Sequence, residues 1–366
     1  MKEGWEYKKL DEVCYVEYGT RVVQKKDGGT IYPVYGGGGE TFRMDRFNRS
    51  DSIVIARFAM SKQCTRFVKG KFFLNDSGLT IRSKVDKIAQ DFLNWHIIAL
   101  NDEIYLLGKG MAQKNLDMPS FRNITLKIPP LSEQQHIVEE LDLLSSIIEK
   151  KKAQLNELDN LAQSLFYEMF GDPITNEKGW EVRKLADISK EKLSYGSGAS
   201  AIPYDGKMRY IRITDINDSG ELNDNIVSPN SFNEKYLLND GDILFARSGA
   251  TVGKTYYHKV KNGKCIYAGY LIRLIPNADI VLPSYVFGYT KTQYYMEFVK
   301  SAQNAVAQPN INAKQYGNLD ICIPPLSLQQ QFASKIEAIE HQKELIKQSI
   351  KEVETLLNSR MDYYFN

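Results

Sequence analysis

The sequence predicts a tandem repeat of two mixed α/β globular domains, with two long helices that pair as an antiparallel coiled coil. Two observations predict this class. The segment from Ala112 to Gln135 returns 195 residues later, from Ala307 to Gln330, with 11 of 24 positions identical and no gap. Each copy is followed by an apolar heptad pattern long enough for a coiled coil. A chain duplicated in this way is expected to be pseudo-twofold symmetric.

The repeat divides the chain into four segments. We expect a globular domain over 1–130, a central spacer helix over 131–170, a second globular domain over 171–325 and a C-terminal spacer helix over 326–366. Shorter echoes, WEYKKL and WEVRKL, mark the start of each copy. Runs of β-branched and apolar residues predict strands within the domains. The predicted strands are Ile53–Ala56, Leu79–Arg82, Tyr210–Thr214 and Ile243–Ala246.

The spacer helices are predicted to begin after paired prolines, since a residue that precedes proline disfavours helical geometry. Ser132 with Gln135, and Ser327 with Gln330, match the capping-box pattern at a helix start. Apolar residues then recur at spacings of four and three, which predicts a pairing seam. The predicted pairing residues are Ile137, Leu141, Leu144, Ile148, Leu155, Leu158, Phe332, Ile336, Ile339, Ile346, Ile350 and Val353.

The two helices most simply pair with each other within one chain. Each helix leaves the carboxyl side of its own domain, so pairing is antiparallel if the two domains lie at opposite ends of the helices. Two separate intermolecular coiled coils are the alternative.

Composition favours an ordinary globular protein of the cytoplasm. The hydrophobic content of 43% and the charged content of 25% are usual for globular domains. No apolar run approaches the roughly 20 residues of a membrane-spanning helix, and the charged start MKEGWEYKK is no signal peptide. The cysteines lack CxxC spacing, so we expect buried reduced thiols and neither disulfides nor a metal site. They are Cys14, Cys64, Cys265 and Cys322.

Basic residues cluster at corresponding places in both copies. No acid lies between Asp51 and Asp76, or between Asp242 and Asp279, and both stretches are rich in Lys and Arg. A local field of one sign is what a polyphosphate partner requires, so a nucleic acid is the expected ligand. A pseudo-twofold molecule would read two half-sites on double-stranded DNA. The candidate DNA-binding residues are Arg57, Lys62, Arg66, Lys69, Lys71, Arg247, Lys254, Lys259 and Lys261.

Arg57 and Arg247 are predicted at the ends of equivalent strands. Each either bridges its domain to a spacer helix or contacts phosphate or guanine through its planar fork. The lysines are assigned mainly to phosphates. Some tyrosines are predicted in loops, where they pack or touch bases; these are Tyr35, Tyr195, Tyr204 and Tyr267.

Four polar residues also repeat between the copies, namely Gln113, Asn115, Gln308 and Asn310. Two halves of a DNA site normally differ, so repeated residues are poor candidates for base discrimination. We expect them to fix each domain against its helix or to position phosphates.

The chain resembles the specificity subunits of type I restriction-modification systems. The resemblance rests on the IPPLSEQQ and IPPLSLQQ helix starts, the AQKNLD and AQPNIN elements, and DILFARSGATVGKT from Asp242 to Thr255. It implies a non-catalytic subunit in which each target-recognition domain reads one part of a bipartite DNA site. It also implies helices that set the gap between the parts and dock two methyltransferase subunits, which bring S-adenosylmethionine. Restriction translocase-nuclease subunits would complete the complex.

Enzymatic functions find little support in the motifs. SGATVGKT lacks the first glycine of a phosphate-binding loop, because Ser248 stands at that position. Ile128 and Ile323 replace the acid or amide that a methyltransferase would use before its paired prolines. We therefore expect no catalytic residues, no metal and no cofactor in the chain itself. The alternatives are the specificity subunit of another multisubunit restriction-methylation system and a coiled-coil scaffold that binds no DNA.

Overall fold

The computed structural model describes residues 4–111, 113–304 and 310–365. The chain forms two compact units, of which the first is made of two stretches of sequence and the second of one. Unit 1 comprises Met1–Lys152 with Gln348–Asn366, and unit 2 comprises Ala153–Lys347. Each long helix therefore contributes one part to each unit. No helix in the described ranges is long and apolar enough to cross a membrane.

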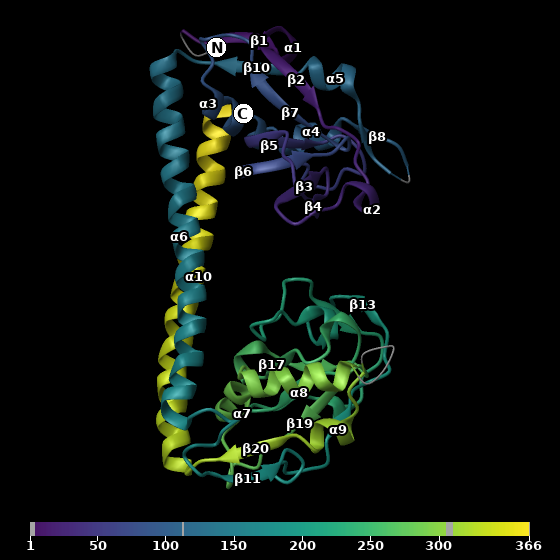
Figure 1. Cartoon of the computed structure of the whole chain (residues 1–366), viewed down its shortest axis with the longest axis vertical. Helices are drawn as coiled ribbons and strands as arrows, with labels where there is room; N and C mark the ends of the chain where they lie inside the picture. Colours follow the sequence, from purple (N-terminus) through teal and green to yellow (C-terminus); the bar gives the residue numbers. More distant parts are fainter. Residues whose placement is uncertain (1–3, 112, 305–309, 366) are drawn as a thin grey trace. The chain divides into compact units, whose positions relative to one another are not determined.

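Unit 1 is built around a six-stranded sheet of order β2-β7-β5-β6-β3-β4 (Figure 1). All neighbouring strands are antiparallel except β3 and β6, which are parallel. The strands are β2 (Cys14–Tyr18), β3 (Tyr32–Gly36), β4 (Gly39–Met44), β5 (Arg49–Ala56), β6 (Thr65–Leu74) and β7 (Gly78–Ser83). The helices of the globular part are α1 (Leu10–Val13), α2 (Gln24–Asp27), α3 (Gln90–Ala99), α4 (Asn101–Leu106) and α5 (Met118–Arg122). Two short strands, β8 (Gly108–Lys109) and β9 (Asn115–Leu116), pair with each other.

The core of unit 1 lies between the sheet and α3. Ile53, Ile55 and Leu79 of the sheet are fully buried, and they belong to one cluster with Phe92 and Leu93 of α3. Alternation along β5 becomes continuous burial near its end, because both faces of the sheet are covered there. The predicted strands at Ile53–Ala56 and Leu79–Arg82 are confirmed.

Unit 2 contains a four-stranded sheet of order β12-β19-β16-β17 and smaller strand pairs. Its strands are β11 (Glu181–Lys184), β12 (Ser194–Tyr195), β13 (Ala201–Pro203), β14 (Arg209–Ile211), β15 (Val227–Pro229), β16 (Ile243–Ala246), β17 (Thr255–Tyr257), β18 (Cys265–Tyr267), β19 (Leu271–Leu274) and β20 (Asp320–Ile323). Its helices are α7 (Pro283–Tyr289), α8 (Gln293–Asn304), α9 (Ala313–Gly317) and the short 3₁₀ turns η1 (Ile213–Asp215), η2 (Glu234–Tyr236), η3 (Gly249–Thr251) and η4 (Val260–Asn262).

Two details of the predicted strands and loops differ in unit 2. The strand predicted over Tyr210–Thr214 ends at Ile211, and the rest turns into η1, where the Asp215 carboxylate accepts from the Arg212 amide. Tyr195 and Tyr267, predicted in loops, lie in β12 and β18, and the Tyr267 ring is buried in the core. Tyr35 of unit 1, also predicted in a loop, lies in β3. The predicted strand Ile243–Ala246 is confirmed as β16.

The opening echo of the repeat forms the same structure in both units. WEYKKL contains β1 (Glu6–Lys9), which pairs antiparallel with β10 (Thr125–Ile128). WEVRKL contains β11, which pairs in the same way with β20. In both units the second strand of the pair leads directly into paired prolines and a long helix. The first and last parts of each globular domain are therefore hydrogen-bonded together at the helix start.

The long helices are α6 (Leu131–Phe170) and α10 (Leu326–Phe365). The capping-box prediction is wrong, because each helix begins one residue before its serine. The amides of Glu133 and Gln134 donate to the carbonyl of Pro130. Leu328 and Gln329 donate in the same way to Pro325. The helical hydrogen bonds therefore begin at the carbonyls of Pro130 and Pro325, and Ser132 and Ser327 lie inside the first turn.

α6 and α10 run antiparallel (Figure 1). In unit 1, Glu140 near the start of α6 accepts hydrogen bonds from Arg360 near the end of α10, at 2.6 and 2.8 Å. In unit 2, Asp159 near the end of α6 pairs with Lys343 in the first half of α10, at 2.7 Å. Only opposite chain directions allow both contacts. The predicted class, an α/β repeat with paired antiparallel helices, is confirmed.

The structure gives the burial of the predicted pairing residues. None of them is exposed: seven have less than a tenth of their surface exposed, and the other five are half-buried. Phe166 and Phe170 are also buried at the end of α6, although Leu165 and Met169 fit the heptad pattern equally well. The two phenylalanines face the globular part of unit 2, where they pack against Tyr285.

A glutamine clamp joins each helix start to its globular domain. Gln134 is fully buried; its Nε2 donates to the carbonyls of Lys87 and Pro129, and its Oε1 accepts from the Ala89 amide, at 2.8 to 2.9 Å. Ala89 is the residue immediately before α3. Every polar atom of this buried side chain is thus matched to the backbone.

Unit 2 has the same clamp. Gln329 is fully buried; its Oε1 accepts from the Leu282 amide at 2.7 Å, and its Nε2 donates to the carbonyls of Ile280 and Pro324 at 3.2 and 2.8 Å. Leu282 is the residue before α7. The clamps explain why the first glutamine of each QQ pair repeats.

Candidate nucleic-acid interface

The two predicted arginines occupy equivalent positions. Arg57 directly follows β5 and Arg247 directly follows β16. The carbonyl of Arg57 accepts from the Leu116 amide at 2.9 Å, and that of Arg247 accepts from the Ile311 amide at 2.8 Å. Leu116 and Ile311, equivalent residues of the repeat, therefore bond to the residue that follows the strand.

Each arginine side chain lies over a tyrosine ring. The guanidinium carbon of Arg57 is 4.9 Å from the ring centre of Tyr18, and that of Arg247 is 4.7 Å from the ring centre of Tyr195. Both tyrosines are 41% exposed. At such distances the ring quadrupole attracts the cation. Arg57 also lies 4.5 Å from the ring centre of Phe58.

The tyrosines belong to a repeat that the sequence analysis missed. Tyr18 lies in EYGT and Tyr195 in SYGS, and each ends the first strand of its sheet. The following glycines permit close packing: a Cβ on Gly19 would lie 1.9 Å from the Asn75 carbonyl oxygen, and one on Gly196 would lie 2.3 Å from that of Ala268. The YG pair was a signal in the sequence, but two residues are too few to stand out.

The repeated asparagines hold the turn after each arginine. The Asn115 side chain accepts from the Ala59 amide at 3.3 Å, and Asn310 accepts from Arg247 Nε at 3.3 Å. Ala59 and the equivalent Gly249 both have positive φ, 49° and 69°. The two turns share this positive φ, which alanine adopts only with strain, but only unit 2 forms a 3₁₀ turn (η3) there in the described residues. Gln113 is exposed, and Gln308 lies outside the described residues.

The other basic residues predicted in unit 1 have varied surroundings. Arg66 is half-buried and donates to the carbonyl of Gly37 at 3.0 Å, which holds the turn between β3 and β4. Lys69 pairs with Glu149 of α6 at 3.0 Å, and both side chains are exposed. Lys71 lies 4.6 Å from the ring centre of Phe47, and Lys62 is exposed. Arg66 and Lys69 are thus engaged by the protein, whereas Lys62 and Lys71 present their charge to solvent.

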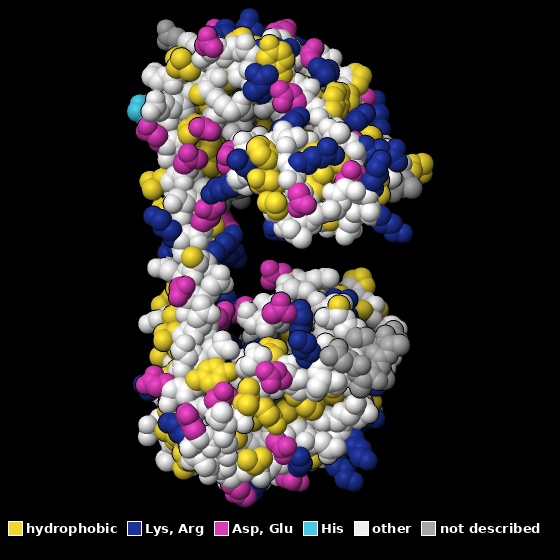
Figure 2. Space-filling model, viewed as in Figure 1, with side chains coloured by type: hydrophobic (Ala, Val, Ile, Leu, Met, Phe, Trp, Pro, Cys, Tyr) yellow, Lys and Arg dark blue, Asp and Glu magenta, His cyan; other side chains and the backbone are white. Residues whose placement is uncertain are grey.

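The basic residues predicted in unit 2 are similarly mixed. Lys254 pairs with the exposed Asp218 at 3.0 Å. Lys259 lies 5.2 Å from the ring centre of Tyr257, and Lys261 is exposed in η4. On the face drawn in Figure 2, Lys and Arg side chains lie beside hydrophobic ones on the globular parts of both units. Acidic side chains also lie among the basic ones on this face.

The cysteines have no activated thiol among them. All four are unpaired and buried, as predicted. Burial raises the pKa of Cys14 to about 12 and those of Cys64 and Cys265 to about 11. A thiol with a raised pKa is protonated at neutral pH and is a poor nucleophile. Within the described part of the chain, no group of His, Cys, Asp or Glu has the arrangement of a metal site.

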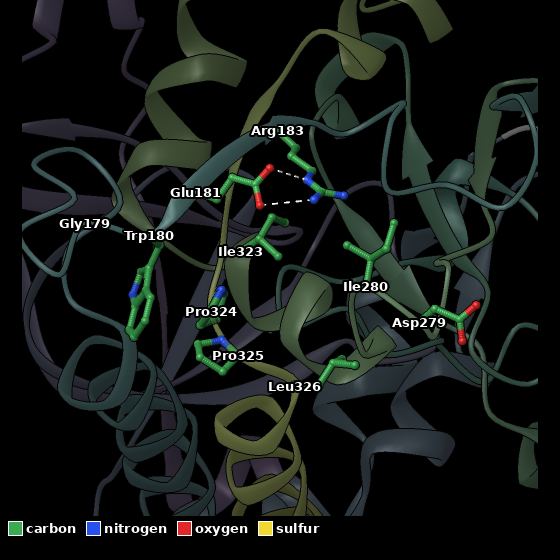
Figure 3. Close-up of a pocket in the computed structure, with 10 residues that line it drawn as sticks. All are labelled: Gly179, Trp180, Glu181, Arg183, Asp279, Ile280, Ile323, Pro324, Pro325 and Leu326. Atoms are coloured by element: carbon green, nitrogen blue, oxygen red, sulfur yellow. Dashed lines mark hydrogen bonds and ion pairs between the residues drawn. The ribbon is translucent and has the colours of Figure 1, made fainter.

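A pocket of about 360 Å³ lies in unit 2 where β11 and β20 meet the start of α10 (Figure 3). Trp180, Pro324, Pro325 and Leu326 form its apolar wall. Glu181 and Arg183 pair across two hydrogen bonds of 2.8 and 3.1 Å, which lowers the pKa of Glu181. Glu181 and Arg183 neutralise each other, and Asp279 also lines the pocket (Figure 3).

A family model matches most of the chain in two blocks. Residues 2–160 and 177–355 match the type I restriction modification DNA specificity domain. The chain is 23% identical to the putative type I restriction enzyme specificity subunit S.HindORF215P of Haemophilus influenzae, over 98% of this chain and 94% of that protein. It is also 23% identical to the EcoKI specificity subunit of Escherichia coli, over 65% of this chain, and spans 55% of that subunit's length.

Two solved structures share the fold over nearly the whole chain. The S subunit of a type I restriction-modification system from M. genitalium aligns with a TM-score of 0.53 and 16% identity, over 98% of this chain and 95% of that one. A chain from a structure of the assembly and conformational transition of the type I R-M system aligns with a TM-score of 0.54 and 18% identity, over 100% and 98%. With both blocks matched, the chain belongs to the family of type I restriction modification DNA specificity domains and carries that domain twice.

Proposed function

We propose that this chain is the DNA-reading specificity subunit of a type I restriction-modification complex. Each unit reads one part of a bipartite site on double-stranded DNA. The observation that carries the proposal is the duplication itself: two equivalent domains, each bearing a Tyr–Arg pair and basic residues, are each joined by a glutamine clamp to an antiparallel helical pair.

The helical pair sets the distance between the two parts of the site. An α-helix is stiff and rises by about 1.5 Å per residue, so its length defines a gap along a duplex. The charged contacts Glu140–Arg360 and Lys343–Asp159 support a fixed register between the helices. The expected twofold relation between the units and the four-segment division of the chain remain predictions.

Two methyltransferase subunits are the proposed partners of the helices. Leu161 of α6 and Leu356 of α10 are separated by the repeat distance of 195 residues and are 51% and 48% exposed. Equivalent exposed leucines on the two helices suit two copies of one partner. The partner supplies catalysis and S-adenosylmethionine, and translocase-nuclease subunits complete the complex. The chain itself is proposed to be non-catalytic.

Methylation mapping tests the proposal. The chain is expressed with the methyltransferase encoded beside it in a host that lacks adenine methylation, and methylated adenines are mapped across the genome. We expect one bipartite motif with a fixed gap. Reversing charge at Lys62 and Lys71 should reduce methylation at every occurrence of that motif, because both cations face solvent.

A matched control is charge reversal at Lys190, an exposed residue of the globular part of unit 2 that lies outside both the basic stretches and the long helices. It should leave methylation unchanged. Absence of any site-specific methylation with an active methyltransferase present would contradict the proposal and favour a scaffold that binds no DNA.

A further inference from the structure

We propose that Arg57 and Arg247 each bind one backbone phosphate of the DNA, pre-oriented by Tyr18 and Tyr195, and read no base. This inference deepens the proposed function and rests on it. It assigns a ligand, the phosphodiester, and a partner residue, the tyrosine, to each of the two arginines.

The Tyr–Arg pair is preserved although its surroundings are not. The chain after Arg57 reads FAMSKQC, whereas the chain after Arg247 reads SGATVGK. Even so, the distances to the ring centres agree within 0.2 Å, at 4.9 and 4.7 Å, and the tyrosines are equally exposed. A geometry that survives such divergence in its neighbours points to a shared task.

The tyrosines are themselves held in place. The Tyr195 hydroxyl accepts from the Ala313 amide, at the start of α9, at 3.0 Å. In unit 1, hydrogen bonds to Tyr18 and Asp11 raise the pKa of Arg122, at the end of the equivalent helix α5. Tyr195 is thus held by the first residue of α9, and Tyr18 interacts with the last residue of the equivalent helix α5. Each ring lies against the guanidinium of its arginine.

The charge of both arginines is available for a ligand. Among the described residues, neither guanidinium has a carboxylate within ion-pair distance, whereas Arg49, Arg82 and Arg273 each have one. Arg247 donates its Nε–H to the side-chain oxygen of Asn310, which leaves its two terminal amino groups for a ligand. Stacking occupies the flat face of a guanidinium and leaves its edge, which matches two oxygens of a phosphate.

Phosphate is the ligand that both units share. The two parts of a bipartite site differ in sequence, so one residue in one setting cannot be selective for both. Backbone phosphates are the same at every position, and contacts to them set the register of a protein on the duplex. Residues that discriminate bases are then expected among the parts of the two units that differ.

The salt dependence of binding tests this. The chain assembled with its methyltransferase subunits is titrated with a duplex of about 40 base pairs that carries the mapped site, at several salt concentrations. Each phosphate contact adds about 0.9 to the slope of log K against log salt. We expect Arg57→Met and Arg247→Met each to lower that slope by about 0.9, and the double variant by about 1.8.

Base selectivity and a matched arginine provide the controls. Duplexes with one base pair changed in either half should lose affinity by the same factor for the variants as for the wild type. Arg57→Lys should keep most of the slope, because lysine keeps the charge. Arg82 stacks 4.6 Å from the ring centre of Tyr15 in the same unit but pairs with Glu17, so Arg82→Met should change neither slope nor selectivity.

The outcomes separate this inference from the proposed function. Site-specific binding by the wild type, with slopes unchanged in both methionine variants, overturns the inference alone and leaves the arginines as structural. Relaxed selectivity at one base pair in either variant means that the arginine reads a base, which also overturns it. A wild-type complex that shows no site-specific binding contradicts both.

Discussion

The ends of the helical pair can be compared between the two units, because equivalent residues build them with different chemistry. In unit 1, Phe365 at the end of α10 packs against Phe92 and His96 of α3, with ring centres 5.6 and 4.7 Å apart. In unit 2, Phe170 at the end of α6 packs against Tyr285 of α7 at 4.8 Å. Phe170 and Phe365 are separated by the repeat distance and are 4% and 1% exposed.

The surroundings of these phenylalanines differ. In unit 2 the cluster is extended by Phe166 and Phe332, with ring centres of 5.0 and 5.1 Å to Phe170. In unit 1 a polar group lies nearby instead, in which Arg360 and Tyr364 bond to the Glu140 carboxylate. The glutamine clamp is the same in both. The aromatic partners differ while the glutamine hydrogen bonds to backbone are the same, so the two units share the attachment of the helix start and not the packing of the helix end.

The largest expected effect comes from removing a clamp. Gln134→Ala or Gln329→Ala leaves a buried amide and two buried carbonyls without their partner. We expect a loss of about 3 kcal/mol of unfolding free energy in the affected unit, since each unsatisfied buried group costs about 1 to 3 kcal/mol. Chemical denaturation, monitored by hydrogen exchange of the backbone amides of each unit, measures this loss of unfolding free energy.

The adjacent glutamines are the control. Gln135 and Gln330 are exposed, and Gln135 bonds only to the neighbouring Glu139. Their alanine variants should change the unfolding free energy by less than about 0.5 kcal/mol. Equal effects at both positions of either QQ pair would show that the clamp is not what holds the helix start.

An intermediate effect is expected when the pH is lowered, because His96 is buried where the end of α10 packs against α3 in unit 1. His96 comes seven residues after the clamped Ala89, and Tyr289 comes seven after the clamped Leu282. Burial, with a smaller effect of Lys127, lowers the pKa of His96 to about 3. Its Nδ1 has no hydrogen-bond partner in the described structure. The folded state therefore keeps this imidazole neutral.

A folded pKa below the unfolded value of about 6.5 means that the unfolded state binds the proton first. The contribution of neutral His96 to the free energy of unfolding is therefore complete above pH 6.5, and it is lost as the pH drops towards 3. Between pH 7 and pH 5 the loss is about 2 kcal/mol, from about 1.4 kcal/mol per pH unit. Urea denaturation at both pH values should show this loss in the wild type and lack it in His96→Phe. Identical pH dependence in the two proteins would contradict the assignment.

The smallest effect on the free energy of unfolding is expected where α6 and α10 pack against each other. Position 148 of unit 1 carries a buried isoleucine, and the position 195 residues later in unit 2 carries Lys343, which is 6% exposed. Its ammonium lies 2.7, 3.2 and 3.6 Å from carboxylates of Asp159, Glu340 and Glu221. Burial would lower the pKa of Lys343, but these carboxylates raise it overall.

Lys343→Ile makes the two positions alike. We expect a loss of about 1 to 2 kcal/mol in unit 2, because the carboxylates lose their counterion but are a third or more exposed to solvent. Lys351→Ile, at an exposed position of the same helix, should have little effect in the same denaturation experiment. A more stable Lys343→Ile variant would mean that apolar packing is enough there and that the lysine serves register alone.

Several features of the site could not have been read from the sequence. The partners of Gln134 lie 45 and 47 residues earlier in the chain, so the pattern of serine and glutamine favoured a local capping box instead. The charge run containing Arg66 and Lys69 was visible, but their partners Gly37 and Glu149 were not. Tyr267 is predicted in a loop, but β18 pairs with β14, a segment more than 50 residues earlier, and this pairing places the residue in the core.

The sequence by itself determined the duplication, the two long helices and their apolar seam. These follow from identity at a fixed offset and from a period that any single helix expresses locally. Only the tertiary structure decided which glutamine holds each helix start, and which cations already have a carboxylate. It also decided that Arg57 and Arg247 lie over tyrosines some 40 to 50 residues earlier in the chain. Hydrogen-bond partners, counterions and stacked rings come from segments distant in sequence, so their identity exists only once the chain has folded.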